Sequence, residues 1–318
     1  GRTALLEQIH QAVRRHVPGI TLPPTIRPVP TGKFNDSFFV SADGRQFVVR
    51  VAPPDNTVFV FYERDMMRQE PGIHDLLRRR TEIPVPQILA YDDSRTVLNR
   101  DFVIMERLPG TPLSECTHPD PETAYEQVGG MLRQAHALTA DSYGYIGEHS
   151  PMPPQNTWAE AFRMMWSRLV DDVCSVGHYT TGEAETLRTA LDRRLHLFDR
   201  PVDACLLHMD VWAQNILVDD SGTVTGLLDW DRALWGDPEI EFAVLDYCGV
   251  SGPSFRRGYG RERERSPEAA VRNLFYLLYE IQKYIVIRQG RHNDRRSAEA
   301  YKKRTFSLLA RGLPDAAS

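Results

Sequence analysis

Residues 206–231 read LLHMDVWAQNILVDDSGTVTGLLDWD, and this stretch decides the fold. It places His208 just before Asp210, Asn215 a short loop further on, and Asp229 after a predicted β-hairpin. Two carboxylates and one amide carbonyl are hard oxygen ligands, which suit a Mg²⁺ ion that shares the phosphate oxygens of a nucleotide. The stretch therefore predicts a site for a metal ion and a phosphorylated ligand.

Two other kinds of site do not fit the sequence. A serine hydrolase would need a nucleophile elbow, and the sequence has no G-x-S-x-G. A zinc enzyme would need closely spaced histidine or cysteine ligands, and His208 has no H-E-x-x-H partner.

The pattern H-x-D-x-x-x-x-N followed by a hairpin and L-x-D-W resembles the catalytic loop and metal-binding strand of protein-kinase-like enzymes. It is most similar to the aminoglycoside phosphotransferase and choline kinase branch, because the chain has His-Met-Asp and Asp-Trp-Asp in place of His-Arg-Asp and Asp-Phe-Gly. The run WGDPEIEFA at 235–243 also resembles that branch. The resemblance implies an α+β, bilobal protein-kinase-like fold, with a small β-rich nucleotide-binding lobe at 1–106 and a larger, mainly helical catalytic and substrate-binding lobe at 107–318.

The resemblance also implies roles for these residues. Asp210 would orient the acceptor hydroxyl in line with the γ-phosphorus and accept its proton late. Asn215 and Asp229 would ligate Mg²⁺. Asp231 would point to the same side as Asp229 if strand geometry continues, as an outer metal contact or as a partner for a cationic acceptor. His208 is expected to fix the loop through a hydrogen bond to the backbone, and Asp237 to cap a helix.

The N-terminal part of the chain resembles the nucleotide-binding half of the family. The loop that begins at Gly32 and includes Ser37 stands where the family positions the nucleotide, although it holds only one glycine. Arg50 stands where protein kinases have lysine, and its carboxylate partner is expected to be Glu70, with Glu63 as the alternative. Backbone groups near Glu106 and Leu108 would hydrogen-bond adenine. The side chain of Met105 would pack near the adenine ring.

Hydrophobic periodicity and turn residues predict the remaining elements. Helices are expected at 2–16, 62–80, 121–139, 157–176, 182–198, 267–289 and 295–311. Strands are expected at 37–41, 46–51, 102–105, 216–218 and 224–228, and residues 83–91 are expected to be extended. The substrate is expected to contact segments at about 145–200 and 250–290.

Charge and composition limit the partners. Residues 107–255 hold 9 Lys and Arg against 23 Asp and Glu, which is compatible with a cationic acceptor and argues against a nucleic-acid groove there. The basic run at 256–265 has interleaved glutamates, so it is expected to be a solvated loop and helix start. No apolar stretch approaches the roughly 20 residues of a membrane span. The four cysteines lie far apart without a C-x-x-C pair, which favours a cytoplasmic protein.

These observations lead to three hypotheses on function. The first is an O-phosphotransferase that uses ATP or GTP and Mg²⁺ to phosphorylate a small-molecule hydroxyl, with an aminoglycoside-like or other antibiotic as the expected acceptor and resistance as the outcome. The second is a housekeeping kinase for an amino alcohol, homoserine or sugar amine. The third is an inactive kinase-like binding module, which is disfavoured because Asp210, Asn215 and Asp229 are all retained. The sequence is silent on the oligomeric state.

Overall fold

The computed structural model describes residues 1–30 and 33–313. Gly32, which was expected in the nucleotide-positioning loop, lies outside the described residues. Among the described helices, none is both long and apolar enough to cross a membrane.

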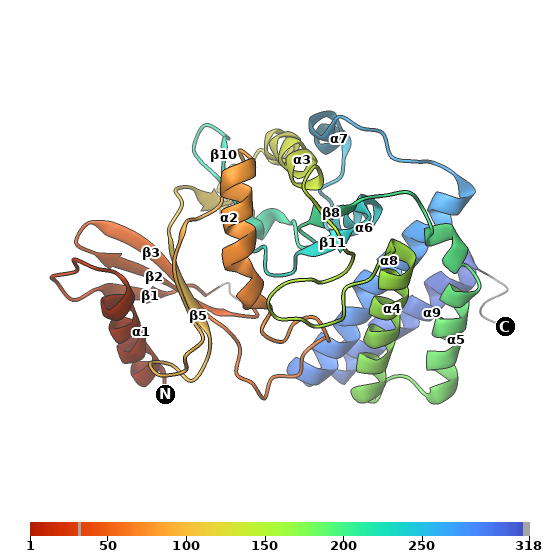
Figure 1. Ribbon diagram of the computed structural model, residues 1–318, viewed down its shortest axis with the longest axis horizontal. Helices are drawn as coiled ribbons and strands as arrows, with labels where there is room; N and C mark the ends of the chain where they lie inside the picture. The colour runs from red at the N-terminus through yellow and green to blue at the C-terminus, as the bar shows by residue number, and fades with distance from the viewer. Residues whose placement is uncertain (31–32, 314–318) are drawn as a thin grey trace.

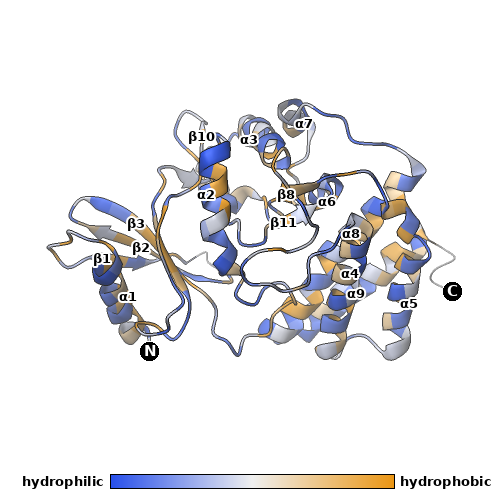
Figure 2. Ribbon diagram, in the orientation of Figure 1, coloured by the Kyte–Doolittle hydropathy of each residue, from blue (hydrophilic) through white to orange (hydrophobic). Residues whose placement is uncertain are grey.

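The first part of the chain forms a five-stranded antiparallel sheet in the order β1-β2-β3-β5-β4, seen at the left of Figure 1. Its strands are β1 (Thr25–Pro28), β2 (Asp36–Ala42), β3 (Arg45–Val51), β4 (Ile88–Asp92) and β5 (Phe102–Glu106). The interior strand β5 is almost wholly apolar, as its orange colour in Figure 2 shows, and its first four residues are buried. The register pairs Ser37 with Arg50 and Arg50 with Val103, which fixes Arg50 in the middle of the sheet.

Two helices accompany this sheet. Helix α1 (Arg2–His16) buries Ile9, Ala12 and Val13 in one cluster with side chains of β2 and β3, as its apolar stripe predicts. Helix α2 (Glu70–Arg80) begins later than the predicted helix 62–80. Asp65 adopts a left-handed conformation at φ 57°, and the 3₁₀ turn η1 (Met66–Gln69) separates it from α2, so a continuous helix from residue 62 was wrong.

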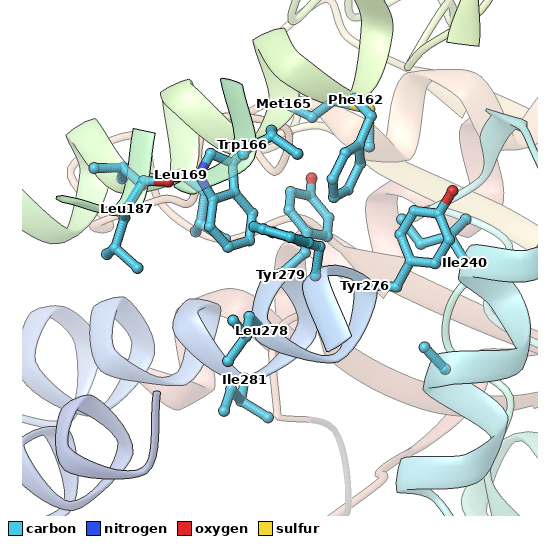
Figure 3. Close-up of a cluster of buried hydrophobic side chains, with 14 of the residues drawn as sticks. Phe162, Met165, Trp166, Leu169, Leu187, Ile240, Tyr276, Leu278, Tyr279 and Ile281 are labelled. Atoms are coloured by element: carbon cyan, nitrogen blue, oxygen red, sulfur yellow. Dashed lines mark hydrogen bonds between the residues drawn. The ribbon is translucent and has the colours of Figure 1, made fainter. Parts of the chain in front are cut away.

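The rest of the chain is mainly helical and packs around an aromatic core. Its helices are α3 (Pro121–His136), α4 (Trp158–Ser175), α5 (Thr181–Asp192), α6 (Pro238–Tyr247), α7 (Pro253–Tyr259), α8 (Pro267–Val286) and α9 (Arg295–Gly312). Figure 3 shows Phe162 and Trp166 of α4 lying against Tyr276 and Tyr279 of α8. The ring centroids of Phe162 and Tyr276 are 5.0 Å apart, edge to face, a geometry that the aromatic quadrupole favours.

Several helix ends differ from the prediction. The expected helix 182–198 ends at Asp192 and is followed by the 3₁₀ turn η3 (Leu195–Phe198). Helix α8 continues into the π-helical turn η5 (Ile287–Arg291), and α7 was not predicted. Asp237 caps α6 as expected, with its carboxylate accepting a hydrogen bond from the Glu239 amide at 2.9 Å.

Two small three-stranded sheets hold the stretch 206–231 in place. One has the order β10-β9-β6 and the other β11-β8-β7. Their strands are β6 (Thr111–Pro112), β7 (Thr139–Ala140), β8 (Ala204–Leu207), β9 (Ile216–Val218), β10 (Val224–Leu227) and β11 (Leu234–Gly236). Because β8 ends just before His208, β9 begins just after Asn215 and β10 ends just before Asp229, three strand ends deliver the predicted site. The division into lobes at 106 and 107 stays our interpretation of this arrangement.

Candidate active site

His208 ties the loop after β8 to the segment after β10. Its Nε2 donates to the carbonyl of Leu228 at 2.6 Å, and its Nδ1 accepts a hydrogen bond from the amide of Asp210 at 3.0 Å. The ring is fully buried and its edge lies against Trp230. This contact geometry fits a neutral imidazole with its proton on Nε2, and it gives His208 the backbone-fixing role that was expected.

Asn215 is hydrogen-bonded directly to Asp210. The Asn215 Nδ2 donates to the backbone carbonyl of Asp210 at 2.8 Å and to its Oδ2 at 3.3 Å. Since both protons of the amide are directed at Asp210, the Asn215 Oδ1 is the atom left to accept or to ligate.

Asp229 begins the third part of the site. Its backbone is left-handed, with φ 63°, so strand geometry does not continue from Asp229 to Asp231 as the sequence suggested. Its side chain is 37% exposed, and its Oδ1 lies 3.2 Å from the Nη2 of Arg50. The Asn215 Oδ1 and the carboxylate of Asp229 are hard oxygen donors of the kind that Mg²⁺ prefers, so these two residues fit the ion that the resemblance implies.

Arg50 links the sheet to the side of the site that holds Asp229 and Asp231. Its Nη1 lies 2.5 Å from the Glu70 Oε1, while its Nη2 contacts both Asp229 and, at 3.1 Å, Asp231. The structure thus pairs Arg50 with Glu70 and not with Glu63. Burial raises the pKa of Glu70, and the guanidinium of Arg50 opposes this shift.

Asp231 is buried and its carboxylate is already engaged. Its Oδ2 accepts hydrogen bonds from Arg50 and from the Asn35 Nδ2 at 3.3 Å, and its backbone carbonyl accepts one from the Gln69 Nε2 at 2.6 Å. These contacts join three separate segments of the first part of the chain to the segment after β10. Asp231 therefore helps to position Arg50, and its expected role as an outer metal contact or as a partner for a cationic acceptor stays a prediction.

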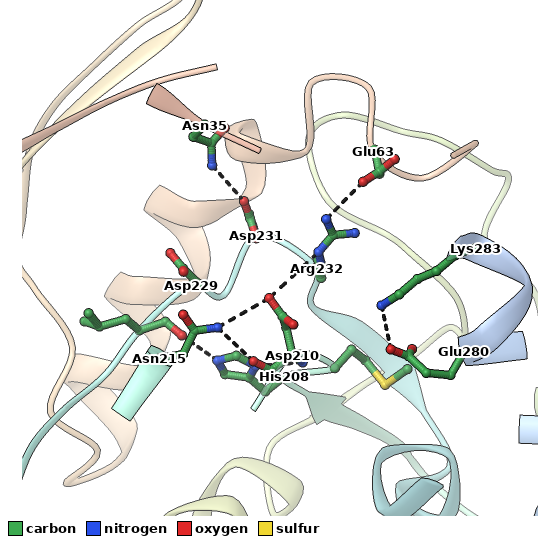
Figure 4. A network of polar contacts seen from close by, with 12 residues as sticks. Asn35, Glu63, His208, Asp210, Asn215, Asp229, Asp231, Arg232, Glu280 and Lys283 are labelled. Atoms are coloured by element: carbon green, nitrogen blue, oxygen red, sulfur yellow. Dashed lines mark hydrogen bonds and ion pairs between the residues drawn. The ribbon is translucent and has the colours of Figure 1, made fainter. Parts of the chain in front are cut away.

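A cleft of about 700 Å³ opens over these residues. Its lining contains six of the predicted site residues: Ser37, Arg50, Asp210, Asn215, Asp229 and Asp231. Figure 4 shows Asp210 between the Asn215–Asp229 side and a pair formed by Glu280 and Lys283 of α8. Expected contacts from segment 145–200 are not among the described lining residues, whereas segment 250–290 contributes several.

The expected adenine contacts lie outside the described lining of this cleft. Met105 is buried in a small cluster with Ala52, Met67 and Val103. The amide of Glu106 donates to the carbonyl of Gln87 at 3.0 Å and is therefore already paired. The roles of Met105, Glu106 and Leu108 in binding adenine stay predictions.

The electrostatics around Asp210 are set by burial and by two cations. Burial raises the pKa of Asp210 to about 6, while Arg232 and Lys283 oppose the shift. The Nε of Arg232 lies 3.9 Å from the Asp210 Oδ2. A carboxylate with a raised pKa is a better proton acceptor than an ordinary aspartate, which suits the role expected for Asp210.

Sequence reasoning missed most of the cations of the cleft. They are Lys33, Arg232, Lys283, Arg288 and Arg291, and the last three come from the end of α8 and from η5. Arg232 directly follows the Asp-Trp-Asp run, so its position in the sequence could have been used to predict that it lies at the site. The α8 residues read only as helix core and flank, because the sequence does not say which face of a helix borders a cleft.

The fold and this site together define a kinase-like phosphotransferase. A family model described as the phosphotransferase enzyme family matches residues 25–274, and the chain belongs to this family of small-molecule phosphotransferases. The chain is 25% identical to a probable ketoamine kinase from Vibrio parahaemolyticus, with 79% of this chain and 82% of that protein covered. It is 26% identical to viomycin phosphotransferase from Streptomyces vinaceus over 55% of this chain and 61% of that protein.

A solved structure confirms the predicted fold. The chain superposes on a thermostable mutant of aminoglycoside phosphotransferase APH(4)-Ia, which was solved in complex with AMP-PNP and hygromycin B. The TM-score is 0.69 at 17% identity, and the match covers 96% of this chain and 99% of the other. The expectation of an α+β, protein-kinase-like fold was therefore correct.

Proposed function

We propose that this chain transfers the γ-phosphoryl group of ATP, or alternatively GTP, to a hydroxyl group of a small molecule, with Mg²⁺ as cofactor. One observation carries the proposal: Asp210, Asn215 and Asp229 converge on one cleft in which Arg50 also lies. This is the set of groups that phosphoryl transfer needs, because its loose transition state is catalysed by alignment and by neutralisation of negative charge.

The reaction balances as a simple substitution at phosphorus. The acceptor oxygen forms a bond to the γ-phosphorus, the bond to the β–γ bridging oxygen breaks, and the nucleoside diphosphate leaves. Asp210 holds the acceptor hydroxyl and takes up its proton. Asn215 and Asp229 would hold Mg²⁺, which would supply charge neutralisation at the phosphate oxygens. Arg50, oriented by Glu70 and Asp231, adds a fixed positive charge on the same side.

The acceptor has two candidates. An antibiotic is supported by the similarity to viomycin phosphotransferase, and resistance would then follow from phosphorylation. A metabolite is supported by the similarity to a ketoamine kinase, which spans more of both chains.

Mass spectrometry of hydroxylated compounds incubated with the protein, Mg²⁺ and ATP or GTP tests the proposal. Aminoglycosides, peptide and nucleoside antibiotics, choline, homoserine, sugar amines and hydroxy acids form the panel, with Asp210→Ala as control. A mass increase of one phosphoryl group with the unaltered protein alone is expected. If Asp210→Ala gave the same product at the same rate, the catalytic assignment would be wrong.

A further inference from the structure

The far side of the cleft, beyond Asp210, is lined by one stripe of α8 and η5. Lys283, Tyr284, Ile287, Arg288 and Arg291 all face it. In an ideal α-helix, residues eight positions apart are rotated by about 80° about the axis, so Lys283 and Arg291 would diverge. The π-helical turn, closed by a hydrogen bond from the His292 amide to the Ile287 carbonyl at 3.2 Å, widens the helix and reduces this rotation. Arg288 and Arg291 of this turn both line the cleft.

The cations on this side outnumber the carboxylates. Four cations (Arg232, Lys283, Arg288 and Arg291) stand against three carboxylates (Glu63, Glu280 and Asp210). Glu280 pairs with Lys283 at 2.6 Å. Glu63 is buried and is shared by Arg232 at 2.9 Å and Arg291 at 2.6 Å, so one carboxylate serves two guanidinium groups.

Arg288 is the cation for which this arrangement provides no carboxylate partner. Within the described chain, its guanidinium has no ion pair and no hydrogen bond, and its Nε is buried without a partner. The Nη1 of Arg232, next to Asp210, is likewise buried and unpartnered. A buried donor without an acceptor costs about 1–3 kcal/mol, and an anionic ligand would satisfy both groups.

The carboxylates behind the expectation of a cationic acceptor are used elsewhere. Glu239 pairs with Arg272 at 2.7 Å, and Glu241 contacts His136 at 2.8 Å. Neither lines the cleft as described. These two carboxylates therefore do not add negative charge to the acceptor side of the cleft.

We propose that the acceptor is an anionic molecule whose carboxylate or phosphate ester is bound by Arg288, while its hydroxyl faces Asp210. This inference rests on the proposed phosphotransferase function and names its class of substrate. Arg288 supplies the specificity for an anionic acceptor. The excess positive charge at Arg232 and Arg291 adds to the attraction for the anion. A guanidinium suits this task because its planar donors match both oxygens of a carboxylate or two oxygens of a phosphate.

Matched acceptor series test the charge of the acceptor. One series compares hydroxycarboxylates with amino alcohols and diols of equal chain length. The other series compares sugar phosphates with their parent sugars. ADP release above the acceptor-free rate is measured with Mg²⁺ and ATP. Phosphorylation of the anionic member at a kcat/KM at least tenfold above its neutral and cationic counterparts is expected. The hydroxycarboxylate and sugar-phosphate arms tell the two anion sources apart.

The failures of the two proposals are distinguishable. Preferred phosphorylation of amines or neutral alcohols would overturn the anionic class and leave the phosphotransferase function intact. Phosphorylation of no member of any class would contradict the phosphotransferase function and the inference that rests on it.

Variants of Arg288 test its role in binding the acceptor, and the thermal midpoint shows whether a variant has lost stability. Arg288→Gln should raise KM for the anionic acceptor at least tenfold, with KM for ATP and the thermal midpoint unchanged, and Arg288→Lys should restore part of the affinity. Arg295→Gln, which removes a guanidinium that is 80% exposed on α9, is the matched control and should change none of these. An equal loss of affinity for neutral acceptors, or a raised KM for ATP alone, would show that Arg288 does not bind the acceptor's anion.

Discussion

The side-chain amide of Asn215 donates both to the backbone carbonyl and to the carboxylate of Asp210, at 2.8 and 3.3 Å. The expected proton acceptor and an expected metal ligand are therefore one hydrogen-bonded unit. Orientation of Asp210 depends on the two amide protons of Asn215, and orientation of the Asn215 Oδ1 depends on Asp210. Neither residue is expected to tolerate a change that leaves the other untouched.

Asn215→Asp tests this coupling with almost no change in shape. The new carboxylate has no protons to donate and would repel the backbone carbonyl oxygen and the Oδ2 of Asp210. We therefore expect kcat to fall by about 10²-fold or more. The thermal midpoint should change little in comparison. Asn99→Asp, at an exposed position, is the control. Activity within threefold of the unaltered protein would contradict the coupling.

His208→Ala should lower kcat by about 10²-fold, because the loop loses the bridge between the Asp210 amide and the Leu228 carbonyl. The affinity for the nucleotide, measured by calorimetry, should change by less than about threefold because no nucleotide contact is assigned to His208. His118→Ala, which removes an exposed histidine, is the matched control. A variant with full kcat would show that the bridge is dispensable.

Glu70→Ala should destabilise the protein by about 3 kcal/mol and raise KM for ATP, since it removes one partner of a buried ion pair with Arg50. Asp75→Ala on the same helix breaks the exposed pair with Arg79 and should cost less than about 1 kcal/mol. Chemical denaturation and ATP titration measure both effects. Equal and small losses in the two variants would exclude a structural role for the Arg50–Glu70 pair.

Asp172 on α4 predicts a pH-dependent stability. Burial raises its pKa to about 7, although its carboxylate accepts a hydrogen bond from the Phe61 amide at 2.7 Å. The folded state therefore binds the proton more tightly than the unfolded chain, so this group's contribution to stability falls as pH rises from about 4 to 7.

Asp172→Asn keeps an oxygen acceptor for Phe61 and removes the charge. At pH 8 the variant should be more stable than the unaltered protein by about 2 kcal/mol, and the difference should vanish near pH 4. Asp141→Asn, at an exposed position outside α4, should show no such trend. A constant difference across this pH range would disprove the raised pKa.

The catalytic part of the site could be predicted because its residues lie within one stretch of sequence. Asp210, Asn215 and Asp229 are separated only by a short loop and a hairpin, so local structure alone brings them near one another. Arg50 and its partner Glu70 were also within reach, since strand β3 and helix α2 follow each other in a family pattern. The choice of Glu70 over Glu63 was correct for the contact that the structure shows.

The cationic side of the cleft could not be predicted in this way. Glu63 meets Arg232 and Arg291 across 169 and 228 positions of sequence, and no local pattern encodes such contacts. The charge count of residues 107–255 does not say which carboxylates are paired in the interior, so it cannot predict the charge on this side of the cleft. The π-helical turn that contains Arg288 and Arg291 also leaves no mark in the hydrophobic periodicity.

The most direct test of the central claim compares catalysis with nucleotide binding in Asp210→Asn. This variant removes the proton acceptor and keeps the side-chain shape, so the transfer of phosphate to an acceptor, followed by mass spectrometry, should fall at least 10³-fold. The dissociation constant for Mg²⁺ and ATP should stay within a few fold, because Arg50, Asn215 and Asp229 remain. Transfer at an undiminished rate would contradict the assignment of Asp210 and, with it, the proposed mechanism.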